Sequence, residues 1–186
     1  SMSQPATVEA PKETPKQASA PVIAQHAATL KALPFSDTRD FDDAARGFLG
    51  TVENAKITSP QGRVIWSLEP YGFLSAEEAP ATVDPSLWRQ SQLCAKHGLY
   101  EVTTAIYQIR GFDLSNMTIV EGDTGIIVID PLISTETAAA ALELYRRNRG
   151  DRQVVAVIYT HCHVDHFGGV KGVTTQEEVN AGKVQI

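Results

Sequence analysis

Two short apolar segments, separated by a stretch with helical spacing, constrain the fold of this chain most strongly. Residues 126–129 and 153–159 are apolar on both faces, which is typical of strands buried within a parallel sheet. Residues 137–148 place alanine, leucine and tyrosine side chains on one helical face, and Ser134 or Thr135 can cap the start of that helix. The order strand, helix, strand predicts an α/β fold.

Weaker patterns predict further elements on the N-terminal side of this unit. Residues 102–110 alternate polar and apolar side chains, which predicts one continuous strand, and residues 114–121 predict the next. Residues 64–68 predict a short strand. A helix is expected within residues 36–50, ending at the glycine, and another over residues 86–97.

Composition and charge exclude several classes of protein. The chain has 186 residues, 42% of them hydrophobic, which is room for one soluble domain or a little more. Its net charge of -6 argues against a nucleic-acid partner, which would need a basic surface. Apolar runs stay far below the ~20 residues of a membrane-spanning helix, so we expect no transmembrane segment.

The prolines divide the chain into regions of different character. Five of the ten prolines fall within residues 1–35, in a stretch with too little apolar surface to offset the entropy cost of ordering. We therefore expect a flexible tail over residues 1–35 and an N-terminal extension over residues 36–100, followed by a more regular domain over residues 101–186. A signal peptide is not recognised at the start of the sequence.

The chemistry of the sequence is concentrated directly after the second buried strand. Three of the five histidines lie within six residues, in the order His161, His163, Asp165 and His166. In an extended segment, alternate side chains project to one side, so the first three converge and His166 turns toward a neighbouring point as the chain bends. Imidazole and carboxylate groups are zinc ligands, and two such pairs suit two metal ions roughly 3.5–4 Å apart.

A histidine-rich surface loop without metal is the alternative interpretation of this segment. It leaves unexplained why three imidazoles and a carboxylate alternate after a hydrophobic strand. Cys162 is expected to point away from the ligands as a small packing residue, with zinc binding as the lesser alternative. Gly168 and Gly169 are expected to let the backbone turn tightly beside the site.

The HxHxDH motif with two following glycines resembles the metallo-β-lactamase superfamily. The resemblance implies a four-layer αββα sandwich, with its N-terminal half in this chain, and a hydrolytic site with two Zn²⁺ ions. By position, His161 and His163 would bind one zinc, and Asp165 and His166 would bind the other, with Asp165 also counted as catalytic. Asp130 would orient the metal loop without binding metal.

A narrower resemblance links the chain to the zinc-dependent alkylsulfatases. It covers about residues 36–186 and rests on five stretches, at residues 79–83, 85–90, 110–118, 121–125 and 129–134. Members of that family are much longer than this chain. The resemblance therefore implies that this is an N-terminal portion and that further metal ligands follow residue 186.

The function implied by this resemblance is hydrolysis of alkyl sulfate esters, such as dodecyl sulfate, to an alcohol and inorganic sulfate. The alternatives are another hydrolase of the same fold, acting on a thioester, lactone or lactam, and a metal-binding or dimerisation module without turnover. A homodimer is implied, and a periplasmic or secreted location is expected, with the cytoplasm left open. A hydrophobic groove should hold the alkyl chain. Its candidate lining residues are Phe73, Leu74, Trp88 and Phe112, but for each of them a place in the core is the stronger interpretation.

Overall fold

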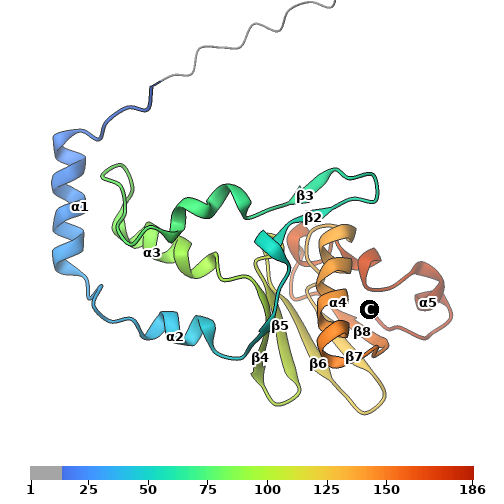
Figure 1. The fold of residues 1–186 in the computed structure, drawn as a ribbon. Coiled ribbons are helices and arrows are strands. Elements are labelled where there is room, and N and C mark those ends of the chain that lie inside the picture. The colour runs from blue at the N-terminus through green and yellow to red at the C-terminus, as the bar shows by residue number, and fades with distance from the viewer. Residues whose placement is uncertain (1–13) are drawn as a thin grey trace, which may run out of the picture.

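A computed structural model describes residues 14–186 (Figure 1). Its first part consists mainly of helices, and its second part is a sheet with helix α4 against it. The N-terminal elements are α1 (Ala20–Ala32), α2 (Arg39–Ala45), β1 (Phe48–Gly50), the 3-10 helix η1 (Glu53–Ala55), β2 (Ile57–Thr58), β3 (Val64–Trp66), the 3-10 helix η2 (Glu69–Ser75) and α3 (Pro85–Cys94). The remaining elements are β4 (Gly98–Thr103), β5 (Ile106–Arg110), β6 (Met117–Glu121), β7 (Ile126–Ile129), α4 (Thr135–Arg149), β8 (Val154–Ile158), η3 (Val164–His166), η4 (Val170–Gly172) and α5 (Gln176–Asn180).

Within residues 14–186, the main sheet has six strands in the order β1-β4-β5-β6-β7-β8. All neighbours are antiparallel except β7 and β8, which are parallel and joined through α4. Ile109 pairs with Met117, and Ile129 pairs with both Thr118 and Ile158. The loops that follow β5, β7 and β8 therefore meet at one edge of the sheet, opposite the hairpin turns at the bottom of Figure 1.

Helix α4 begins at a side-chain cap and packs on the sheet. The hydroxyl of Ser134 accepts the backbone N–H of Thr137 at 3.1 Å, which settles the choice of cap left open by the sequence. The ring of Tyr145 lies 5.9 Å from that of Tyr107 on β5. The side chains expected to face inward are all buried: Ala138, Ala141, Leu142 and Tyr145. The described residues thus form a helical layer on a sheet layer, and the predicted α/β fold is confirmed.

The single strand predicted over residues 102–110 is wrong, because the segment folds into the hairpin of β4 and β5. Thr103 pairs with Ile106, and Ala105 between them has a φ of 65°. Alanine rarely adopts this left-handed conformation, and the segment contains no glycine or proline to mark a turn. The alternation of polar and apolar residues continues through this turn, so the sequence pattern does not reveal it.

The helix expected within residues 36–50 ends earlier than predicted. Helix α2 stops at Ala45, and Phe48 lies in strand β1, opposite Tyr100 of β4. Gly47 causes the change of structure, since its φ is +77° and a Cβ atom there would stand 2.0 Å from the carbonyl oxygen of Glu101. Phe48, whose spacing fitted the predicted helix, is therefore a strand residue.

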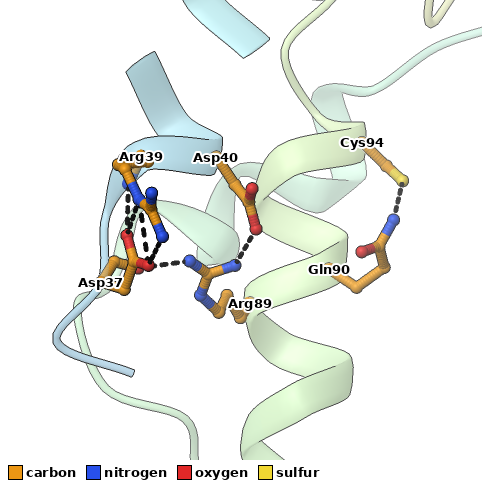
Figure 2. Close-up of polar contacts among 6 residues, drawn as sticks. All are labelled: Asp37, Arg39, Asp40, Arg89, Gln90 and Cys94. Atoms are coloured by element: carbon orange, nitrogen blue, oxygen red, sulfur yellow. Dashed lines mark hydrogen bonds and ion pairs between the residues drawn. The ribbon is translucent and has the colours of Figure 1, made fainter. Parts of the chain in front are cut away.

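Arg89 of α3 connects α2 to the rest of the molecule (Figure 2). Its guanidinium donates to the carboxylate of Asp40 at 2.9 Å and to the carbonyl oxygen of Asp37 at 2.6 Å. The same guanidinium lies 5.1 Å from the ring centre of Phe41, in a cation–π arrangement. Helices α1 and α2 contain no buried residue, so polar contacts hold this part of the described chain in place.

The expected division of the chain at residues 35 and 100 stays a prediction. Part of the expected tail lies outside the described residues, and the part inside them includes helix α1. Residue 100 falls within β4, and β1 of the expected extension pairs with that strand. Among residues 14–186, the helices are too short or too polar to cross a membrane.

Candidate metal centre

Asp130, at the end of β7, holds the loop that follows β8. One carboxylate oxygen accepts the backbone N–H of Thr160 at 2.8 Å. The other accepts the Thr160 hydroxyl at 2.7 Å and lies 2.8 Å from Nδ1 of His166. Burial raises the pKa of the Asp130 carboxyl, but the bonds from Thr160 and His166 outweigh burial, and the pKa falls below its ordinary value. Asp130 is therefore a carboxylate that fixes the loop's first residue and its last histidine.

The contact with Asp130 fixes the tautomer of His166. When Nδ1 donates to the carboxylate, the neutral ring has its lone pair on Nε2. Nε2 lies 3.3 Å from a carboxylate oxygen of Asp165. Two acceptors that face each other repel unless a proton or a metal ion lies between them, and two ligands of one tetrahedral zinc stand roughly 3.3 Å apart. The spacing of Asp165 and His166 therefore fits a shared metal ion.

The remaining two histidines lie beside this pair. The ring centre of His161 is 4.1 Å from that of His166 and 4.7 Å from that of His163. The Thr160 hydroxyl donates its only proton to Asp130, so the 2.8 Å contact between Thr160 and Nδ1 of His161 requires His161 to donate. Nε2 of His161 is then also left with its lone pair for a metal ion. The loop thus gathers all four predicted ligands.

Among the described residues, a geometric criterion for a metal site selects Asp130, His161 and His166 and does not include His163 or Asp165. One donor atom each from Asp130, His161 and His166 lie within 4.8 Å of one another. The Asp130 carboxylate already accepts three hydrogen bonds, from two groups of Thr160 and from His166. These bonds are consistent with a role for Asp130 in holding the loop, and the structure also leaves it close enough to His161 and His166 to share a metal ion with them.

The glycines after the motif are required by close packing. A Cβ atom on Gly169 would stand 2.1 Å from the carbonyl oxygen of Pro131, and one on Gly168 would stand 2.3 Å from that of Ile133. The N–H of Gly169 donates to the carbonyl oxygen of Leu132 at 2.9 Å. The loop is thus pressed against the segment that begins with Asp130, and close approach, more than a tight turn, explains these glycines.

A buried aspartate that sequence analysis assigned no role braces the same loop from another side. The carboxylate of Asp113, 5% exposed, accepts the Thr137 hydroxyl at 2.6 Å and the N–H groups of Ile133 and Ser115 at 2.9 and 3.1 Å. The Ser115 hydroxyl then donates to the carbonyl oxygen of Asp165. The sequence predicted a strand from residue 114, but β6 begins only at Met117, so Ser115 lies in the loop before it.

The expectation that Cys162 is a small packing residue is wrong, because this residue is exposed. Phe112 is fully buried in the core, which agrees with the stronger of its two interpretations, and it does not line an open groove.

Comparison with known proteins relates this chain to a family and to individual relatives. Residues 110–185 match the family model of the metallo-beta-lactamase superfamily. The chain is 54% identical over 175 residues to a linear primary-alkylsulfatase of Pseudomonas sp. The aligned region covers 94% of this chain and 26% of that protein. The chain is 53% identical over 156 residues to the alkyl/aryl-sulfatase BDS1 of Saccharomyces cerevisiae, spanning 84% of this chain and 24% of that protein.

A solved structure extends the similarity to three dimensions. The stereoselective inverting sec-alkylsulfatase Pisa1 from Pseudomonas sp. superposes with a TM-score of 0.85 at 47% identity, covering 91% of this chain and 26% of that chain. Residues 110–185 thus form part of a domain of the metallo-beta-lactamase superfamily, as the motif predicted. Within that class, this chain is homologous to alkylsulfatases, and it spans about a quarter of the length of the relatives it matches.

Proposed function

We propose that this chain contributes a zinc site to the hydrolysis of alkyl sulfate esters, giving an alcohol and inorganic sulfate. The observation that carries the proposal is the convergence of His161, His163, Asp165 and His166 in a chain about half identical to named alkylsulfatases. The names of the relatives cover linear primary and (R)-specific secondary substrates. Alkyl sulfates are the substrate class that these names share.

Two zinc ions are the metals that suit this donor set. His161 and His163 would hold one ion, and Asp165 and His166 would hold the other. Bound zinc supplies a Lewis acid that lowers the pKa of water to ~7 and offsets the charge of an anionic ester. The chain itself contributes the arrangement: Asp130 keeps His166 in one tautomer, and Ser115 fixes the backbone of Asp165.

The test is sulfate release from dodecyl sulfate by the full-length protein, together with its metal content. The double substitution His161→Ala, Asp165→Ala should remove bound zinc and reduce sulfate release by at least about 100-fold, because it takes one ligand from each pair. Cys162→Ala is the matched control, since this residue lies in the same loop, is exposed and is not one of the four proposed ligands. Hydrolysis of a lactam, lactone or thioester without sulfate release would contradict the proposal.

We also propose a periplasmic or secreted location and a homodimer. The support for export is the proline-rich composition of residues 1–35 and the resemblance to the alkylsulfatases. Cell fractionation of the native host tests the location, and light scattering of the full-length protein tests the dimer. Recovery in the cytoplasm or a monomeric mass would contradict the respective proposal.

A further inference from the structure

The loop between β5 and β6, residues 111–116, carries two polar side chains into the interior. Asp113 is 5% exposed and Ser115 is 7% exposed, whereas Leu114 between them is 70% exposed. Loops normally run over the surface and keep their polar side chains in water. The inward direction of Asp113 and Ser115 therefore calls for an explanation, and their hydrogen-bond partners supply it.

Three donor groups surround the Asp113 carboxylate. One oxygen accepts the backbone N–H of Ser115 at 3.1 Å, and the other accepts the N–H of Ile133 at 2.9 Å and the hydroxyl of Thr137 at 2.6 Å. Ile133 and Thr137 flank the start of α4, where the helix dipole favours a negative charge. An asparagine amide could not replace the carboxylate, because its NH₂ group would face a donor in either orientation. The surroundings therefore require a carboxylate at this position.

Ser115 connects this fixed carboxylate to the metal loop. Its N–H is held by Asp113, and its hydroxyl donates to the carbonyl oxygen of Asp165. That carbonyl belongs to the planar peptide group that joins Asp165 to His166. The orientation of this one peptide group therefore affects the positions of both side chains of the pair.

The other pair of proposed ligands is reached from a different carboxylate. Thr160 donates its hydroxyl to Asp130 and contacts Nδ1 of His161. The hydrogen bonds of Asp113 and Ser115 instead meet the loop at Asp165, four residues further along the chain. The two buried carboxylates thus act on different parts of the metal loop.

We propose that Asp113 is a positioning residue for the metal ion shared by Asp165 and His166, and that it acts through Ser115. The inference rests on the proposed function, which assigns these two ligands to one zinc ion. The Asp113 carboxylate holds the backbone of Ser115, and the Ser115 hydroxyl holds the peptide group between the ligands. Loss of either link loosens that ion and leaves the ion at His161 and His163 in place.

Metal titration of the full-length protein tests the inference without turnover. Competition with a chelator measures the affinities of the two zinc ions, and cobalt(II) spectra of His163→Ala and His166→Ala show which ion is which. In Ser115→Ala, the ion at Asp165 and His166 should bind about 10- to 100-fold more weakly, while the other ion keeps its affinity. Asp113→Asn should have the same selective effect, because it leaves the Ser115 backbone without a fixed acceptor.

The double variant Asp113→Asn, Ser115→Ala distinguishes one chain of contacts from two independent contributions. Since both residues act through the same hydroxyl, the double variant should weaken the ion no more than the more affected single variant does. Losses that add, equal weakening of both ions, or an unchanged affinity in Ser115→Ala would overturn the inference.

Ser59→Ala is the matched control, since Ser59 is also buried, at 8% exposed, and its hydroxyl also bonds to a backbone group, the N–H of Arg63 at 3.2 Å. It should keep the affinities of both ions. Circular dichroism checks folding, and if Asp113→Asn does not fold, Ser115→Ala decides alone, because it removes a single hydroxyl. A wild type that binds two zinc ions but releases no sulfate from dodecyl sulfate would instead overturn the proposed function.

Discussion

The metal-loop region, residues 130–173, and the N-terminal helices α1 and α2 are held in place by different means. The metal loop packs against the start of α4, where its glycines lie against backbone carbonyl oxygens. The buried carboxylates of Asp113 and Asp130 accept hydrogen bonds from the segments around the loop. Helices α1 and α2 have no buried residue and expose apolar side chains such as Ile23 and Leu30. The metal-loop region is thus held by close backbone contacts and buried carboxylates, whereas α1 and α2 are held by contacts near the surface.

This difference predicts where substitutions are tolerated. Around the metal loop, the structure cannot easily adjust to an added carbon atom or a lost hydrogen-bond acceptor, because the neighbouring atoms belong to the backbone. Around α1 and α2, the same change meets solvent. The predictions below compare matched substitutions in the two kinds of environment, beginning with the largest effect.

Gly169→Ala should cost at least about 3 kcal/mol of unfolding free energy. Its Cβ would stand 2.1 Å from the carbonyl oxygen of Pro131 and 2.6 Å from that of Ser134, and neither backbone oxygen can move without displacing the metal loop. Urea unfolding measures the effect. Gly72→Ala, in η2, is the control: a Cβ there meets nothing within 4 Å, and its effect should stay within about 0.5 kcal/mol. Equal stability of the two variants would mean that the loop is not tightly packed.

Asp130→Asn should weaken zinc affinity of the full-length protein by about 10- to 100-fold. The amide cannot accept three hydrogen bonds as the carboxylate does, and it removes the negative charge that favours the N–H on Nδ1 of His166. Competition with a chelator measures the affinity. Asp123→Asn, in the exposed turn between β6 and β7, should leave it unchanged. Unaltered affinity in Asp130→Asn would contradict the role of Asp130 in holding His166.

The contacts of Glu121, on β6, predict that part of the protein's free energy of unfolding depends on pH. Its side chain, 9% exposed, accepts bonds from Arg149 at 2.9 and 3.0 Å and from the Tyr145 hydroxyl at 2.8 Å. The bonds from Arg149 lower its pKa below 4.5, outweighing burial, and Tyr145 adds to the effect. The contribution to stability is therefore complete above pH 4.5 and is lost as the pH falls through the lowered pKa.

Glu121→Gln should thus reduce the unfolding free energy at pH 7 by about 1.5 kcal/mol, and the difference from wild type should shrink in acid. Unfolding by urea at several pH values measures it. Glu143→Gln, whose side chain is 69% exposed and 3.8 Å from Arg147, should change stability by less than about 0.5 kcal/mol. A difference that grows toward low pH would contradict the assignment.

The same contrast explains which parts of the molecule the sequence predicted. The two buried strands and α4 depend on local patterns, and they were predicted correctly. The HxHxDH residues lie together in the loop after β8, and their role as ligands stays a prediction. The turn at Ala105 and the strand residue Phe48 were missed because a left-handed alanine and a close approach to Glu101 leave no periodic signal. Asp113 was missed because its partners lie on segments distant in sequence, and only the fold brings them together.

Arg89→Gln should have the smallest effect on global stability, less than about 1 kcal/mol, because its bonds to Asp40 and to the Asp37 carbonyl lie at a partly exposed junction. Its expected effect is local: amides of α2 should exchange hydrogen several-fold faster, while those of α4 stay unchanged. Arg39→Gln is the control, since its ion pair with Asp37 is exposed and joins neighbours in sequence. A loss of several kcal/mol, or faster exchange in α4, would show that α2 and the sheet unfold as one unit, and the distinction between the two regions would then fail.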